Sequence, residues 1–451
     1  MTDERKITLD DVIDDSSAPG IRVVVFAICF CIAMLDGFDT QAIGFVAPVI
    51  SQAWQLAPDS MGVVFAAGLF GLTIGALMFG PIADIYGRKG ILLISVVIFG
   101  SFALATAWAQ TYHQLLLFRF LTGIGLGGAM PNVIALTSEY FPKRNRTTMV
   151  TLMFIGFPIG AVVGGLAGGK LISLFGWQSI FYVGGIAPLL MLPIILLLLP
   201  ESVRYLAKKD RSSAQFASIL TRFNYRPKVD AAQIDILEKD SAQVSPVRVL
   251  FTEGRALATA LLWIIFFVNL LILYFLVNWL PTVMTTAGVS LERAIVAIAV
   301  LNLGGVIGGF VLSRFCDKVG PFAVLALSYM LAAVFVALIG QAVTSIPLSL
   351  ATIFFAGFFV IGAQFCANAV AAQFYPTAGR SAGVGWALGV GRIGSIVGPM
   401  IGGTMIAAGL TIDRLLLFSG LPAIIAAVCV LALPFVGAAR TAPATVRPSE
   451  A

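Results

Sequence analysis

Charged residues are what this chain has least of. Asp, Glu, Lys and Arg make up only 11% of its 451 residues, compared with roughly 25% in soluble globular proteins. Hydrophobic residues make up 59% and the mean hydropathy is +0.99, which excludes a string of soluble domains. The net charge of +6 comes without a stripe of basic and aromatic residues, so we expect no nucleic-acid partner.

Histidine and cysteine are also scarce. The only histidine is His113, to which we assign no role, and the five cysteines show no C-x-x-C or metal-ligand spacing. They predict packing groups rather than a metal site. We find no nucleophile-base pair and no phosphate loop, so we expect no enzyme activity, no cofactor and no metal. The acidic first twenty residues lack the basic segment of a cleavable signal peptide.

Long hydrophobic runs fill most of the chain. A run of about 20 apolar residues crosses a ~30 Å hydrocarbon layer as a helix, and continuous runs differ from the alternating segments of a β-barrel. The sequence therefore predicts an all-α polytopic membrane protein with twelve transmembrane helices. The predicted spans are 21–50, 60–83, 91–110, 113–140, 149–173, 176–200, 255–283, 290–313, 321–342, 346–375, 379–408 and 410–437.

The spans form two sets of six, separated by the one long polar stretch. We predict an N-terminal tail over 1–20, a six-helix bundle over 21–200, a central loop with short amphipathic helices over 201–254, a second bundle over 255–437 and a tail over 438–451. If the N-terminus is inside, the outer segments hold only Lys170, Arg293 and Arg414 of the 28 basic residues. Basic residues are retained on the cytoplasmic side. Both termini are therefore expected in the cytoplasm, and the protein in the cytoplasmic (inner) membrane as a multi-pass chain.

The two bundles repeat each other in sequence. Residues 84–87 recur as 317–320, Pro142 and Arg146 recur as Pro376 and Arg380, and residues 159–164 recur as 393–398, each 233 or 234 positions later. Three matches in order indicate duplication of a six-helix unit. Parallel repeats of this kind are typical of transporters whose substrate site lies between the halves near the midplane.

The turn Gly80-Pro81-Ile82-Ala83-Asp84-Ile85-Tyr86-Gly87-Arg88-Lys89 resembles the G-x-x-x-D-R-x-G-R-K signature of the major facilitator superfamily. Ile85 departs from it, and the second copy has Ser313 where the leading glycine would stand. The resemblance implies an inner gate, while the alternative is a simple turn at a helix end. The residues assigned to this gate are Gly80, Asp84, Gly87, Arg88, Glu139, Arg146, Asp317 and Arg380, with Glu139 expected to belong to one charge network with Arg88 and Arg146.

A narrower resemblance begins at Asp36-Gly37-Phe38-Asp39 in the first span. This element and the segments 119–140, 278–282 and 375–392 resemble the aromatic acid:proton symporters, over about residues 20–437. The resemblance implies import of a small aromatic carboxylate, such as 4-hydroxybenzoate, protocatechuate or benzoate, together with protons.

Two carboxylates in the first span are candidates for proton coupling. Asp36 and Asp39 lie roughly 21 to 26 Å along the helix from Arg22 at 1.5 Å per residue, on one helix face. Carboxylates within the membrane usually face a cavity, pair with a cation or carry protons. Arg119 is the expected partner of Asp39, by resemblance to sugar/proton symporters of the same superfamily. A purely structural salt bridge or helix cap is the alternative.

Arg392 lies in the middle of the span 379–408, and the last six spans hold no Asp or Glu near their middle, since Glu292 and Asp413 lie at the outer side and Asp317 in an inner loop. A guanidinium binds a carboxylate with two hydrogen bonds, so the substrate is expected to supply the missing anion. The alternative is an Arg satisfied by backbone carbonyls or reaching toward the interface. The expected substrate-binding residues are Arg392, Asn132, Asn278, Gln364, Asn368, Trp279 and Trp386, each of which could instead be a helix-packing group.

Three other functions compete with this one. Gly156, Gly160, Gly164 and Gly165 approximate an antiporter motif, with Ala161 in place of its proline, which leaves a drug/proton antiporter open. A transporter of another organic anion is the second. A membrane sensor for aromatic acids is the third, although neither the central loop nor the tail is long enough for a signalling domain. The expected partners are the substrate, protons and the lipid bilayer, and the chain is expected to act as a monomer.

Overall fold

The structure, a computed structural model, describes residues 8–16, 18–209, 214–223, 247, 250–252, 255–343, 345–375 and 380–437. It divides into two compact units. The first holds Met1–Asp240 with Ser290–Ala299, and the second holds Ser241–Val289 with Val300–Ala451.

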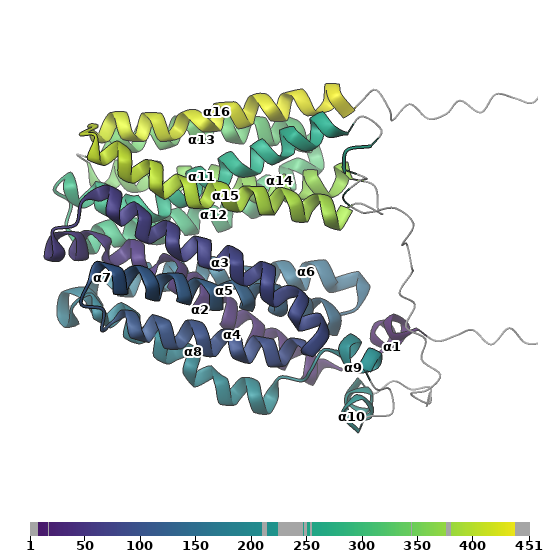
Figure 1. The fold of residues 1–451 in the computed structure, drawn as a ribbon. Helices are drawn as coiled ribbons and strands as arrows, with labels where there is room; N and C mark the ends of the chain where they lie inside the picture. The colour runs from purple at the N-terminus through teal and green to yellow at the C-terminus, as the bar shows by residue number, and fades with distance from the viewer. Residues whose placement is uncertain are drawn as a thin grey trace, which may run out of the picture. The chain divides into compact units, whose positions relative to one another are not determined.

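The first unit contains the helices coloured purple to teal in Figure 1. They are α1 Leu9–Asp15, α2 Pro19–Trp54, α3 Pro58–Tyr86, α4 Arg88–Thr106, α5 Tyr112–Tyr140, α6 Lys143–Phe154, α7 Gly156–Phe175, α8 Gln178–Leu198, α9 Val203–Lys209 and α10 Ala214–Phe223.

The second unit contains the helices that follow the central loop. They are α11 Ala256–Thr286, α12 Leu291–Val319, α13 Pro321–Ala342, α14 Ile346–Phe374, α15 Arg380–Ala407 and α16 Ile412–Gly437. The beginning of α12, up to Ala299, groups with the first unit.

Twelve helices among the described residues are long and apolar enough to cross a membrane. This confirms the predicted all-α class and the twelve spans, with α6 and α7 forming one span, Lys143–Phe175. The prediction placed the start of that span at residue 149, but the helix begins directly after Pro142. The difference arises because the first helical turn is polar, and counting apolar residues does not detect a polar helix end.

The packing within the two units follows the repeat predicted from the sequence. In the first unit α2 packs on α7, α4 on α5 and α4 on α8, and in the second α11 packs on α15, α13 on α14 and α13 on α16. Gly160 of α7 lies against the carbonyl oxygen of Met34, and Gly394 of α15 lies against that of Phe267. Both glycines and both carbonyls are 233 or 234 residues apart, so the same close helix crossing occurs twice.

Three short helices accompany the first unit. The sequence analysis predicted amphipathic helices in the central loop, and α9 and α10 are present there, with Leu206, Phe216, Ile219 and Phe223 buried. The α1 helix was not predicted, because its seven residues are too few for a periodic pattern. Most of the remaining loop, residues 1–7 and the tail over 438–451 lie outside the described residues.

Candidate functional site

Asp39 of α2 and Arg119 of α5 form a buried ion pair in the first unit. Nη2 of Arg119 donates to Oδ2 of Asp39 at 3.1 Å, and Nη1 donates to Oδ1 at 3.3 Å. The side chains are 0% and 3% exposed. The guanidinium carbon lies 5.5 Å from the ring centre of Phe181, and Gly184 of α8 passes close to the Asp39 carboxylate. The pairing predicted for these two residues is therefore observed, and its role in coupling stays a prediction.

Small residues in α5 allow this burial. Gly123 and Gly127 lie against backbone carbonyls of α3, and Gly125 lies against the backbone of α4 at Phe99. A side chain at any of these glycines would separate the helices. Because α5 packs closely on α3 and α4, Arg119 is buried, and the carboxylate of Asp39 on α2 is its counter-ion.

Asp36 and Asn132 are buried in the same unit. Asp36 is 1% exposed and its Oδ1 accepts a hydrogen bond from Thr40 Oγ1 at 3.0 Å. Asn132 donates to the carbonyl of Gly128, one turn earlier in its own helix, at 2.8 Å. Its Oδ1 is buried and accepts no hydrogen bond from the residues that the structure describes. Asn132 therefore keeps one acceptor for a further partner.

Arg392 of α15 meets Tyr274 of α11 in the second unit. Nη1 of Arg392 lies 3.4 Å from the Tyr274 hydroxyl. Within the described part of the chain Arg392 forms no salt bridge, although it lies in the middle of a membrane-spanning helix. Tyr274 was not among the predicted site residues. A tyrosine on a neighbouring span, able both to donate and to accept, was the signal that could have identified it.

Three amides form a chain between α11 and α14. Asn269 Nδ2 donates to Gln364 Oε1, and Gln364 Nε2 donates to Asn368 Oδ1 at 3.1 Å. Asn269 is fully buried, and its Oδ1 has no hydrogen-bond partner among the described residues. The structure thus joins two predicted residues, Gln364 and Asn368, and adds Asn269.

The other predicted substrate residues of the second unit make packing contacts. Asn278 donates to the Tyr274 carbonyl at 2.7 Å, and Trp279 uses its only donor, Nε1, on the Pro399 carbonyl at 2.8 Å. Trp386 is 47% exposed and stacks on Trp263, with ring centres 5.9 Å apart. These contacts fit the packing alternative, and a role in substrate binding stays a prediction for all three.

The turn between α3 and α4 carries the signature residues. Arg88 pairs with Asp84 at 2.9 Å and with Glu139 of α5 at 3.0 Å. Gly87 has a φ of 101°, and Gly320, its repeat equivalent, has a φ of 105°. Side chains other than glycine rarely adopt this backbone conformation, so the glycine is required at the same place in both turns.

Within the predicted charge network of the gate, no ion pair joins Arg146 to Glu139 among the described residues. Arg146 pairs with Asp10 of α1 at 3.5 Å, whereas Glu139 accepts a hydrogen bond from Ser202 in addition to Arg88. Lys143 and Arg204 also pair with Asp10, at 3.3 and 3.2 Å. The physical reason is that α1 brings a carboxylate to the basic start of α6. Because this helix was not predicted, the contact could not be predicted either.

Burial raises the pKa of Asp10, but the positive charges of Arg204, Lys143 and Arg146 outweigh it and hold the pKa below its ordinary value. Glu201 was also missed. Its carboxylate accepts the backbone N–H of Lys89 at 3.0 Å, in the signature turn. The signal was an acidic residue directly after the sixth span, near two basic loops.

The structure describes few contacts around the remaining predicted gate residues. Asp317 is exposed. A Cβ atom on Gly80 would meet no described atom within 4 Å. The side chain of Arg380 lies outside the described residues.

The family model described as Major Facilitator Superfamily matches residues 29–399 and again residues 297–451. The chain belongs to the major facilitator superfamily. The chain is 41% identical over 411 residues to the 4-hydroxybenzoate transporter PcaK of Pseudomonas aeruginosa, covering 91% of each chain. It is 39% identical to the gallate transporter of Pseudomonas putida, covering 94% of this chain and 95% of the relative.

The fold is also that of solved superfamily members. The crystal structure of a D-xylose-proton symporter matches with a TM-score of 0.70 at 16% identity, covering 90% of this chain and 97% of the other. The relatives confirm the predicted resemblance to aromatic-acid transporters, and they are named as transporters rather than enzymes. Twelve spanning helices in a superfamily of transporters make this chain a multi-pass inner-membrane protein.

Proposed function

We propose that this protein imports a small aromatic carboxylate, of the 4-hydroxybenzoate or protocatechuate kind, by proton symport. The observation that carries the proposal is Arg392, which lies in the middle of α15 without a carboxylate partner among the described residues. Relatives named for the transport of 4-hydroxybenzoate and gallate support the same class of substrate.

Arg392 binds the substrate carboxylate. Its planar guanidinium presents two parallel N–H groups to the two oxygens, and the Tyr274 hydroxyl at 3.4 Å provides a third donor beside it. The amide chain of Asn269, Gln364 and Asn368 supplies partners for hydroxyl groups on the ring. Amides suit this task because they donate and accept at once.

The Asp39–Arg119 pair carries the proton. With Arg119 beside it, the negative charge of the Asp39 carboxylate is neutralised. When alternating access moves Arg119 away, a buried carboxylate without a counter-ion is costly, and binding a proton restores neutrality. Asp36, one helical turn earlier and also buried, is the candidate for a second proton. A second proton per monoanion would add the membrane potential to the driving force, at about 2.3 kcal/mol per charge per 100 mV.

Alternating access requires gates that open on one side at a time. The charges around the α3–α4 turn, Asp84, Arg88 and Glu139, form the inner gate in this proposal, with Asp317 and Arg380 as their counterparts in the second unit. No cofactor takes part, and the proton gradient supplies the energy.

The test is uptake of labelled 4-hydroxybenzoate and protocatechuate into proteoliposomes under an imposed inward proton gradient. We expect gradient-dependent uptake that a protonophore abolishes. Asp39→Asn should lose the dependence on the gradient, and Arg392→Ala should reduce uptake by roughly tenfold or more at limiting substrate. Asp59→Asn and Arg293→Ala make the same chemical changes at exposed positions and should transport like the wild type.

The alternatives predict other results. If the wild type moves neither acid, while other organic anions or cationic drugs alter proton flux, the substrate class or the direction is wrong. The structure offers the antiporter little support. Gly156 and Gly160 lie against backbone carbonyls of α2, and Gly394 of α15 makes the same contact in the second unit. Helix packing therefore accounts for these glycines.

A further inference from the structure

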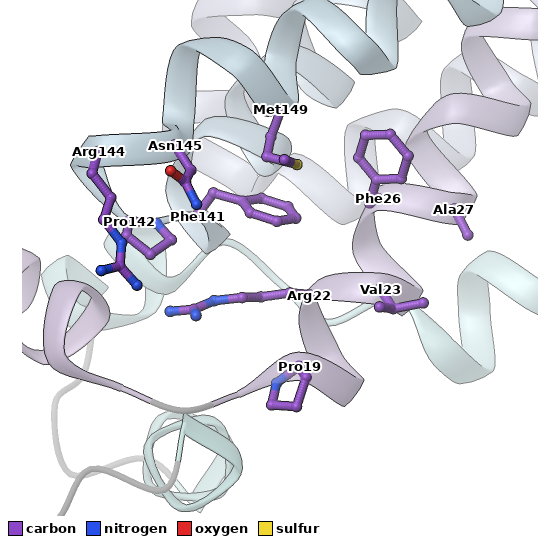
Figure 2. A pocket seen from close by; sticks show the side chains of 10 residues that line it. All are labelled: Pro19, Arg22, Val23, Phe26, Ala27, Phe141, Pro142, Arg144, Asn145 and Met149. Atoms are coloured by element: carbon purple, nitrogen blue, oxygen red, sulfur yellow. The ribbon is translucent and has the colours of Figure 1, made fainter.

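A cavity of about 390 Å³ lies in the first unit, away from the buried pair of α2 and α5. Its wall is largely apolar. Val23, Phe26 and Ala27 come from the first turns of α2, and Phe141 and Met149 come from the end of α5 and from α6. Figure 2 shows these side chains around the pocket. Val23 is 64% exposed, so the wall opens to the surroundings of the helices rather than into the interior of the unit.

One end of this pocket is basic. Figure 2 shows the guanidinium groups of Arg22 and Arg144 at the same end, with Asn145 beside them and the apolar side chains of α2 at the other end. Arg22 is fixed there, because it donates to the carbonyl of Tyr140 at 3.0 Å and to that of Ile13 at 2.7 Å. A permanent positive charge is thus held at the mouth of an apolar pocket.

Arg144 is the free group of the two. It is exposed, and among the residues that the structure describes it has neither a hydrogen bond nor an ion pair. Its neighbours Lys143 and Arg146 both pair with Asp10, and the Asp14 carboxylate accepts the backbone N–H of Lys143 at 2.7 Å, so the two acidic side chains nearby already have partners. Two cations close together at one end of a pocket favour an anionic occupant.

The occupant must also cover the apolar wall. The pocket lies at the first turn of a membrane-spanning helix, which places it near a boundary between membrane and water. A small soluble anion would leave the apolar side chains uncovered, and an uncharged lipid would leave Arg144 without a counter-ion. An amphipathic anion satisfies both ends, and basic pockets between helix ends are where acidic head groups bind.

We propose that this pocket binds one acidic phospholipid. Its phosphate accepts hydrogen bonds from the Arg144 guanidinium and the Asn145 amide, and its acyl chain lies along Val23, Phe26 and Ala27. Guanidinium and phosphate match in a bidentate geometry. A zwitterionic phospholipid has the same phosphate, but it brings an ammonium group that Arg22 and Arg144 would repel. The site should therefore select phosphatidylglycerol over phosphatidylethanolamine.

The test is native mass spectrometry of the full chain in mixed micelles of detergent with phosphatidylglycerol or phosphatidylethanolamine. We expect one phosphatidylglycerol to be retained with higher affinity than any phosphatidylethanolamine. Arg144→Gln should weaken that binding by about tenfold, the loss of one charge-assisted contact. Ala27→Trp fills the pocket without changing charge and should abolish it. Lys208→Gln, an equal loss of charge at the exposed end of α9, should bind like the wild type.

Three outcomes would overturn the proposal. The first is equal retention of both lipids by the wild type, and the second is unchanged retention by Arg144→Gln, an exposed position whose substitution should leave the fold intact. The third is displacement of the lipid by inorganic phosphate, which would make the pocket a site for a soluble anion.

Discussion

At the scale of single residues, the pairing of charges determines which groups are available for transport. Arg119 and Asp39 neutralise each other in a site that is almost fully closed to solvent. Breaking a buried pair by removing one partner leaves an uncompensated charge and costs about 3 to 5 kcal/mol. Removing both partners leaves no uncompensated charge. Substitutions at this pair should therefore affect the stability of the protein and its transport activity differently.

We expect Asp39→Asn and Arg119→Gln each to lower the unfolding temperature in detergent. The double variant Asp39→Asn/Arg119→Gln should recover much of that loss, because no unpaired charge remains, while its proton-driven uptake stays absent. Thermal unfolding and uptake measured on the same preparations test this. A double variant as unstable as the sum of the single ones would mean that the two charges do not interact.

The amide chain makes a second prediction at this scale, about selectivity. Gln364 bridges Asn269 and Asn368, and a ring hydroxyl that loses its polar partner leaves an unsatisfied group. Gln364→Met keeps the length of the side chain and removes both hydrogen-bonding functions. We expect it to lower kcat/KM for 4-hydroxybenzoate by about tenfold relative to benzoate. An equal loss for the two acids, in competition uptake, would show that the amides do not contact the ring hydroxyl.

At the scale of helices, the N-terminal helix is held by ion pairs as well as by apolar packing. Val12 and Ile13 of α1 are buried in the core of the first unit, and Asp10 meets three cations from α6 and α9. A carboxylate whose pKa is lowered by docking stabilises the docked form above its ordinary pKa. That stabilisation disappears as the pH falls through the lowered value.

The ordinary pKa of Asp10 is 3.8, and docking lowers it. Docking of α1 should therefore be unchanged from about pH 7 to about pH 4 and should weaken only below that range. Hydrogen exchange of the α1 amides, corrected for intrinsic rates, measures this. Asp10→Asn should show weaker protection that depends less on pH than in the wild type. Loss of protection between about pH 7 and pH 5 in the wild type would contradict the assignment to Asp10.

The sequence predicted the long helices better than the short ones. Each span is recognisable as an apolar run, which is why α2 to α5, α7, α8 and α11 to α16 could be located without a structure. The α1 helix has seven residues and depends on tertiary contacts with Arg22, Lys143 and Arg146. Contacts of this kind join distant parts of the chain, so a local pattern does not contain them.

The same limit applies to the candidate site. The Asp39–Arg119 pair could be predicted because two opposite charges within the membrane have few other ways to be neutralised. The contact between Tyr274 and Arg392, by contrast, was not predicted, because a tyrosine in an apolar helix shows that it can donate and accept but not which residue of another helix it meets. Trp279 and Trp386 were selected by residue type alone, and that property does not distinguish a substrate wall from the packing contacts that the structure shows.

At the scale of the whole molecule, the duplication fixes the topology once the side of one terminus is known. Each set of six spans returns the chain to the side where it began, so we expect both termini and the central loop on one side. We predict that this side is the cytoplasm, because Lys and Arg in short loops resist translocation. The lipid pocket depends on this orientation as well, since acidic head groups there would belong to the cytoplasmic leaflet.

Reporter fusions along the full chain test the orientation. Green fluorescent protein joined after residue 213 or residue 451 should fluoresce, because it folds in the cytoplasm, while alkaline phosphatase there should be inactive. Phosphatase joined after residue 56 or residue 410, in the turns before α3 and α16, should be active, because it requires export. A matched pair of fusions at residues 142 and 176, on either side of the span formed by α6 and α7, should give opposite signals. Phosphatase activity after residue 451 would place the C-terminus outside. The basic α5–α6 turn would then face outward, where neither the proposed inner gate nor the lipid site could work as described.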